Sequence, residues 1–79
     1  MRQDRLPQPD WVIARRVAIG RRVRAARLDE RMSMQRLGEH AGVDRRTISS
    51  IEIGSTDPSL SVLLRIADAL HVQPRDLIG

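Results

Sequence analysis

Two adjacent arginines, Arg45 and Arg46, stand at the polar start of a short helical stretch. The planar guanidinium group of arginine carries a fork of donors that matches the O6 and N7 acceptors of guanine in the DNA major groove. One well-placed bidentate pair contributes about 1–3 kcal/mol of discrimination between bases. If this helix enters a major groove, we expect at least one of the two to contact a base edge. The alternative is that both contact only phosphate, which carries no sequence information.

The charge of the chain is distributed unevenly along its length. The 79 residues carry a net charge of +4. Residues 1–46 hold 12 arginines and six acidic residues, a net charge of +6, whereas residues 47–79 hold two arginines and four acidic residues, a net charge of −2. A lopsided basic surface favours a polyanionic partner. A solvated arginine-rich face with no partner is the alternative that charge alone leaves open.

Few residues in the chain are suited to other kinds of chemistry. There is no cysteine, and the two histidines, His40 and His71, lie 31 positions apart, so no metal-binding spacing appears. Asp29 and Glu30 are adjacent and therefore point to different faces, which argues against a catalytic carboxylate pair. No nucleophile–base arrangement is present. We predict neither an enzyme nor a metal or cofactor site.

Helical periodicity and capping residues predict five short helices and no strands. The expected helices run from Trp11 to about Leu28, Met34 to about Ala41, Arg45 to about Ile53, Ser59 to about Leu70, and Pro74 to Leu77. We expect Asp10, Ser33 and Asp44 to cap the first three and Gly42 to end the second in a left-handed conformation. Gly20 weakens the first helix by about 1 kcal/mol, which allows a bend or a later start. Residues 1–9, with two prolines, read as a flexible arm, leaving residues 10–79 as one domain.

The expected core is aliphatic, because Trp11 is the only aromatic residue. The predicted inward positions are Ile19, Val23, Ala26, Leu37, Ala41, Val43, Ile48, Ile51, Leu63, Ile66, Ala67 and Leu70. Residues 11–13 favour a core or dimer contact. Leu77 and Ile78 fit either a dimer patch or the closure of the core.

The stretch from Met34 to Gly54 has the organisation of a helix-turn-helix unit. Two short helices flank a Gly-Val turn that is too short for antiparallel packing, so the helices must cross steeply. The residues here and around it resemble the phage-repressor-like (Cro/C1-type, xenobiotic-response-element-like) helix-turn-helix family. The resemblance covers about three quarters of the chain and rests on the runs IGRRVRAAR, LGEHAGV, TISSIEIG and PSLSVLLRIADAL. It implies an all-α, five-helix fold and a regulator that binds double-stranded DNA, mostly as a dimer on a palindromic site.

The resemblance also assigns roles to individual residues. It places the recognition helix, the one that enters the groove, at residues 44–53. The implied base-contacting residues are Arg45, Arg46, Ser50, Thr47 and Ser49. For phosphate contact, the candidates at the start of the second helix and after the third are Ser33, Met34, Gln35, Arg36, Ser55 and Thr56. Arg27 and Glu52 match a structural salt bridge of the family.

Five positions depart from the family pattern. Two lie late in the recognition helix: Ile53 stands where a basic or polar residue is common, and Ser50 where a longer one often sits, which leaves the recognition surface small after its first turn. The other three are Met34, Gly38 and His71. Met34 stands where the family usually has a glutamine that touches phosphate, which leaves only the backbone contact at this position. Gly38 replaces a preferred alanine and softens the second helix. His71 replaces a glycine at a helix end, where a left-handed residue is needed and histidine is tolerated better than most.

Sequence-specific DNA binding and transcription regulation is the function that these features favour, together with a cytoplasmic location. The chain also resembles the restriction–modification controller proteins in its length and in the run from Asp44 to Ser49. A second class is an antitoxin or similar module, in which residues 1–18 or the C-terminal end bind a partner protein and DNA binding serves autoregulation. RNA binding is weaker, because RNA readers stack bases on aromatic side chains. No apolar run approaches the length of a membrane span.

Overall fold

Five helices make up the part of the chain that the structure, a computed structural model, describes: residues 7–79. They are α1 (Asp10–Asp29), α2 (Met34–Ala41), α3 (Arg45–Glu52), α4 (Leu60–Ala69) and α5 (Pro74–Ile78). The predicted all-α, five-helix class is confirmed. Of the predicted arm, residues 1–6 lie outside the described residues.

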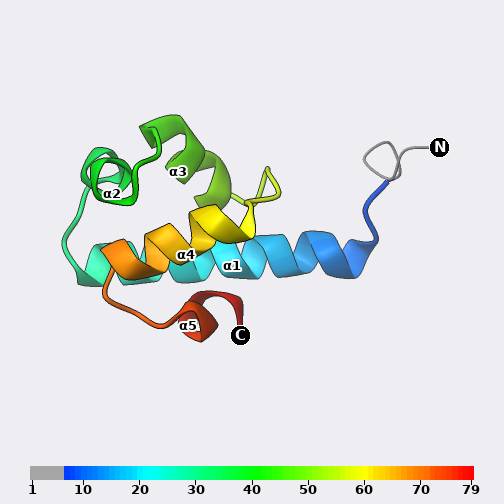
Figure 1. Cartoon of the computed structure of the whole chain (residues 1–79). Helices are drawn as coiled ribbons and strands as arrows, with labels where there is room; N and C mark the ends of the chain where they lie inside the picture. The colour runs from blue at the N-terminus through cyan, green and yellow to red at the C-terminus, as the bar shows by residue number, and fades with distance from the viewer. Residues whose placement is uncertain (1–6) are drawn as a thin grey trace.

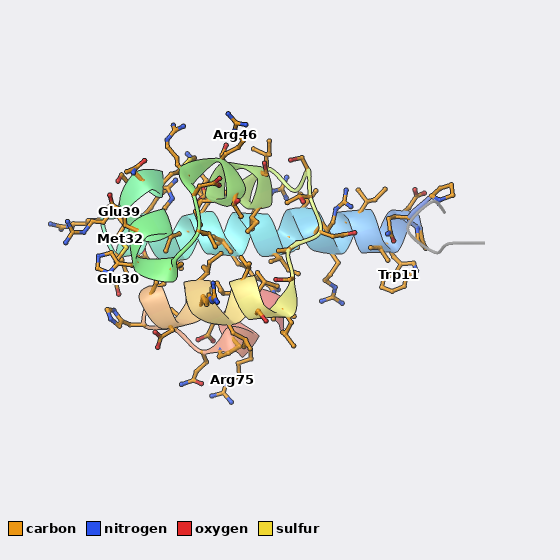
Figure 2. All side chains as sticks on the ribbon, turned by 45° about the horizontal axis from the view of Figure 1, so that its top comes forward. Trp11, Glu30, Met32, Glu39, Arg46 and Arg75 are labelled. Carbon is orange, nitrogen blue, oxygen red and sulfur yellow. The ribbon has the colours of Figure 1, made fainter. Side chains whose placement is uncertain are left out.

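The long helix α1 packs against α3 and α5, while α2 packs against α3 and α4, and α4 also packs against α5. Figure 1 shows α2 and α3 on one side of α1 and α5 on the other, and Figure 2 shows α4 alongside α1. The first turns of α1 project beyond this body, so Trp11, on that projection, is 72% exposed. Trp11 is therefore not a core residue of the single chain.

The start of α1 differs from the prediction. Asp10 is the first helical residue and not the cap, and no side chain caps this end. The carbonyl oxygen of Pro9 accepts hydrogen bonds from the amides of Val12 (3.0 Å) and Ile13 (3.2 Å), so the helix begins one residue earlier. The carboxylate of Asp10 still lies in the first turn, where negative charge favours a helix.

Gly20 does not bend or delay α1, which runs without interruption from Asp10 to Asp29. A Cβ atom at this position would clash with the carbonyl oxygen of Ile51 and lie 2.7 Å from that of Glu52. The missing side chain lets the backbone of α1 approach the end of α3 closely. Its function here is packing, which outweighs its poor helix propensity.

The core contains nearly all of the residues expected from the helical periodicity. Its fully buried large side chains are Val23, Leu37, Ile48, Ile51, Ile66, Leu70 and Leu77. Ala26 and Val43 lie at the edge, partly buried against it. Leu77 is buried and closes the core, so it is not part of an exposed dimer patch. Ile78 is half-buried beside it.

The predicted caps and turns explain where most of the helices begin and end. Ser33 and Asp44 each accept a hydrogen bond from the amide three residues on, as the predicted N-caps should. Ser59, expected as the first residue of the fourth helix, is instead the N-cap of α4, which begins at Leu60. Gly42 is left-handed, with φ of 75°, and so is His71, with φ of 59°. The left-handed Arg31, with φ of 56°, was not predicted. Among residues 7–79, no helix is both long and apolar enough to cross a membrane.

Candidate nucleic-acid interface

The turn between α2 and α3 brings the two helices together at a steep angle (Figure 1). The left-handed Gly42 ends α2, and the amide of Val43 donates to the carbonyl oxygen of Gly38 over 2.9 Å, which folds the turn back onto α2. A Cβ atom on Gly38 would lie 2.6 Å from the carbonyl oxygen of Val43. The family's preferred alanine would therefore require this turn to shift, so the glycine is matched to a tight turn.

Asp44 fixes the first turn of α3. Its carboxylate accepts a hydrogen bond of 2.7 Å from the amide of Thr47. Hydrogen bonding by the side chain and the backbone amide of Thr47 lowers the pKa of Asp44, and the charge of Arg46 acts in the same direction. The cap is thus a carboxylate at neutral pH, beside the two arginines that begin α3.

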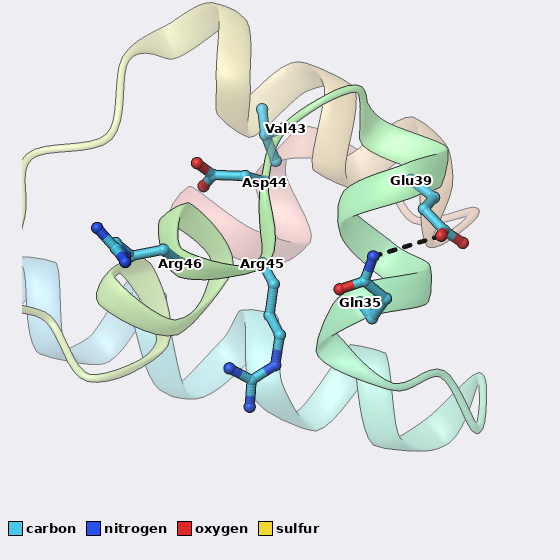
Figure 3. Close-up of a pocket in the computed structure, with 6 residues that line it drawn as sticks. All are labelled: Gln35, Glu39, Val43, Asp44, Arg45 and Arg46. Carbon is cyan, nitrogen blue, oxygen red and sulfur yellow. Dashed lines mark hydrogen bonds between the residues drawn. The ribbon is translucent and has the colours of Figure 1, made fainter.

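Arg45 and Arg46 are exposed and line a hollow between the start of α3 and the outer side of α2. Figure 3 shows their guanidinium groups leaving the helix in different directions. The other residues of the hollow are Gln35, Glu39, Val43 and Asp44. The Gln35 amide donates to Glu39 over 3.4 Å, so the α2 wall is polar and partly acidic. Sequence reasoning missed Glu39 as part of this surface, because the hollow forms only when α2 and α3 cross.

The remaining outward positions of α3 carry short side chains. Thr47, Ser49 and Ser50 are half-buried. Ser50 lies one turn after Arg46 on the same face. The exposed Ile53, at 69%, extends that face beyond the last helical residue. Sequence reasoning did not select Ile53 for contact, although helical spacing from Arg46 and Ser50 was a usable signal.

The candidate phosphate-contacting residues of α2 are in different environments. Gln35 and Arg36 are exposed, whereas Met34 is half-buried and packs against the core. The Met34 side chain therefore does not share the surface of its neighbours. The Ser33 hydroxyl accepts from the amide of Arg36 over 3.0 Å and caps the helix, with its own hydrogen left to donate.

The loop from Gly54 to Ser59 carries the other two candidates. Both the amide of Ser55, at 3.1 Å, and its hydroxyl, at 3.2 Å, donate to the carbonyl oxygen of Ser50. Thr56 is half-buried beside it. Ser55 thus closes the end of α3 and links the loop to that helix.

Arg27 and Glu52 form a buried, two-pronged ion pair between α1 and the last turn of α3. The Arg27 Nε atom lies 2.6 Å from Oε2 of Glu52, and its second terminal nitrogen lies 2.9 Å from Oε1. The third nitrogen donates to the carbonyl oxygen of Met32 over 2.9 Å. The side chains are only 8% and 2% exposed. Hydrogen bonding to Glu52 raises the pKa of Arg27 against the opposing effect of burial. The pair connects α3 to α1 and to the segment that enters α2.

The model of one helix-turn-helix family matches residues 23–77 of the chain, which is more than half of its length. The chain belongs to this helix-turn-helix family. It is the phage-repressor-like (Cro/C1-type) family that the sequence resemblance indicated. Its members are DNA-binding transcription regulators and not enzymes.

Two curated relatives of this helix-turn-helix regulator are similar over most of its length. It is 39% identical to control protein C.BamHI of Bacillus amyloliquefaciens over 64 residues, 80% of this chain and 79% of that protein. It is 32% identical to the immunity repressor protein of Bacillus phage phi105 over 63 residues, 80% of this chain. It spans only 44% of the phage repressor's length.

Solved structures show the same fold. The restriction–modification controller protein C.AhdI from Aeromonas hydrophila has a TM-score of 0.80 and 34% identity, over 82% of this chain and 94% of that one. The P22 c2 repressor in complex with synthetic operator 9T has a TM-score of 0.73 and 33% identity, over 77% of this chain and 92% of that one. The resemblance to controller proteins is thus present in both the sequence and the fold of the helix-turn-helix regulator.

Proposed function

We propose that the regulator binds double-stranded DNA sequence-specifically as a homodimer and reads a palindromic operator through residues 44–53. The observation that carries this proposal is the exposed Arg45–Arg46 pair at the start of a helix that α2 and a buried ion pair hold in place. Because the backbone of this helix is already held in place, binding costs only the ordering of its side chains. We further propose a cytoplasmic location, which operator DNA as the ligand supports.

Base reading is assigned to the outward face of α3. Arg45 and Arg46 are suited to the O6 and N7 atoms of guanine. Thr47, Ser49 and Ser50 reach only bases that the helix approaches closely, because their side chains are short. Ile53 supplies apolar contact for a thymine methyl group. The acidic residues of the hollow favour bases with exposed amino groups and disfavour close phosphates.

Phosphate contact is assigned to the two ends of this face. At the α2 end, the hydroxyl of Ser33, the amides of Met34 and Gln35, and the side chain of Arg36 are available, since helix N-termini attract anions. At the other end, Ser55 and Thr56 lie on the loop after α3. These contacts fix the position of α3 along the duplex without reading sequence.

Binding of a partner protein is a second function that one observation favours. Trp11 is 72% exposed on the projecting turns of α1, outside the residues that the family model matches. A large exposed aromatic side chain is typical of protein interfaces. Partner-protein binding would become the leading function if the chain selected no DNA sequence.

Replacing Arg45 or Arg46 with alanine is expected to relax the preference for guanine at one position of each half-site. The expected loss on the preferred duplex is about 1–3 kcal/mol. Affinity for duplexes that already lack that guanine should change much less. Binding titrations on a series of single-base variants measure this difference.

The control is Arg75→Ala, because Arg75 is exposed on α5, well away from Arg46 (Figure 2). It removes the same charge without removing a proposed base contact. Equal losses for Arg45→Ala and Arg46→Ala on every duplex would show that these arginines contact phosphate alone.

A further inference from the structure

Arg16, in the first half of α1, is linked to a loop far along the chain. One terminal nitrogen of its guanidinium group lies 3.2 Å from Oδ1 of Asp57, 41 residues later, in the loop between α3 and α4. Arg16 precedes residues 23–77, the part that the family model matches. The contact therefore joins the first half of α1 to the loop that follows the recognition helix.

The environment of Arg16 differs from that of a solvated surface arginine. Its side chain is 21% exposed, whereas that of Asp57 is 57% exposed. Its Nε atom is buried and has no hydrogen-bond partner among the described residues. A half-exposed ion pair adds little to stability, and a buried donor without a partner subtracts from it. Stability alone therefore does not account for the placement of this side chain.

The neighbouring residue of α1 contacts the other end of the same loop. Gly54 has φ of 75°, and a Cβ atom there would lie 2.9 Å from a methyl group of Val17 and 3.0 Å from its Cα atom. The loop is thus fixed at Gly54 by Val17 and at Asp57 by Arg16. The two residues between these points are Ser55 and Thr56, the candidate phosphate-contacting residues.

We propose that Arg16 and Asp57 form a brace that positions Ser55 and Thr56 for contact with the DNA backbone. Arg16 is a positioning residue: it acts through the loop and does not itself touch DNA. The inference rests on the proposed DNA-binding function. The brace is expected to affect affinity on all duplexes by a similar factor, because phosphate contacts carry no sequence information.

The test asks whether removing the negative charge of Asp57 raises or lowers the affinity for DNA. Asp57→Ala removes a negative charge near the DNA, and general electrostatics predicts tighter binding. The brace predicts the opposite, a loss of about fivefold, which corresponds to losing roughly one hydrogen bond. Asp68→Ala is the matched control, because Asp68 is exposed on α4 and makes no side-chain hydrogen bond within residues 7–79. It should leave affinity unchanged or raise it slightly.

A second substitution separates positioning from direct contact. Arg16→Met keeps the length of the side chain and should weaken binding as much as Asp57→Ala does, with no further loss in the double variant. If Asp57→Ala binds as tightly as the wild type or more tightly, while Arg16→Met binds weakly, Arg16 contacts phosphate directly and the brace is wrong. Circular dichroism and melting of each variant must show the native helix content at the binding temperature. A wild-type protein that binds no duplex would instead contradict the proposed function.

Discussion

Glu52→Ala is expected to lower the free energy of unfolding by about 3–5 kcal/mol, because it leaves Arg27 charged and buried without its partner. Arg27 is only 8% exposed, and two of its nitrogens would lose hydrogen bonds to the carboxylate. At roughly 0.05–0.15 kcal/mol per residue, a chain of this length is stable by about 4–12 kcal/mol, so the loss is a large share of the total. Denaturant unfolding followed by circular dichroism measures it.

Two further variants show whether the loss comes from an unpaired buried charge. Glu39→Ala removes an exposed carboxylate of α2 and should change stability by less than about 0.5 kcal/mol. The double variant Arg27→Met/Glu52→Leu should recover most of the stability, since apolar groups of similar volume can replace a buried pair. A single Glu52→Ala variant as stable as the wild type would show that the pair contributes nothing to holding α3.

Gly20→Ala is expected to destabilise the protein by about 1–3 kcal/mol, although helix propensity alone predicts a gain of about 1 kcal/mol. The added methyl group would meet backbone oxygens of α3, which cannot move without displacing the helix. The recognition helix would shift, so affinity for DNA should fall as well. Thermal melting and DNA titration measure the two effects.

The same helix provides the matched control. Ala25 is exposed, and Ala25→Gly should cost about 1 kcal/mol through helix propensity alone, with DNA affinity unchanged. Within the same helix, alanine should therefore be less stable than glycine at position 20 but more stable than glycine at position 25. A stabilising Gly20→Ala substitution would contradict the close contact between α1 and α3.

Local signals in the sequence were sufficient for most of the fold. The caps at Ser33 and Asp44 and the left-handed Gly42 use hydrogen bonds within a few residues, which neighbouring sequence determines. The buried stripe of α4 followed from spacing alone, because Leu63, Ile66 and Leu70 repeat at the helical period.

The features that were missed depend on contacts between distant segments. Helix propensity marks Gly20 as a weak point of α1, and only the carbonyl groups of α3 show that it is a packing position. The brace from Arg16 to Asp57 joins residues 41 positions apart, and no local pattern predicts it. In the candidate site, the resemblance selected Arg45 and Arg46, but the acidic wall of the hollow appears only when α2 is in place.

The central claim is best tested by selecting binders from a random pool of DNA duplexes at about 0.15 M salt and measuring the mass of the complex on the enriched duplex. We predict a palindromic motif bound by two chains, with half-sites about 34–36 Å apart, or one turn of the double helix. No enrichment of any sequence would contradict sequence-specific binding. Enrichment of a motif without symmetry, held by one chain, would contradict the dimer.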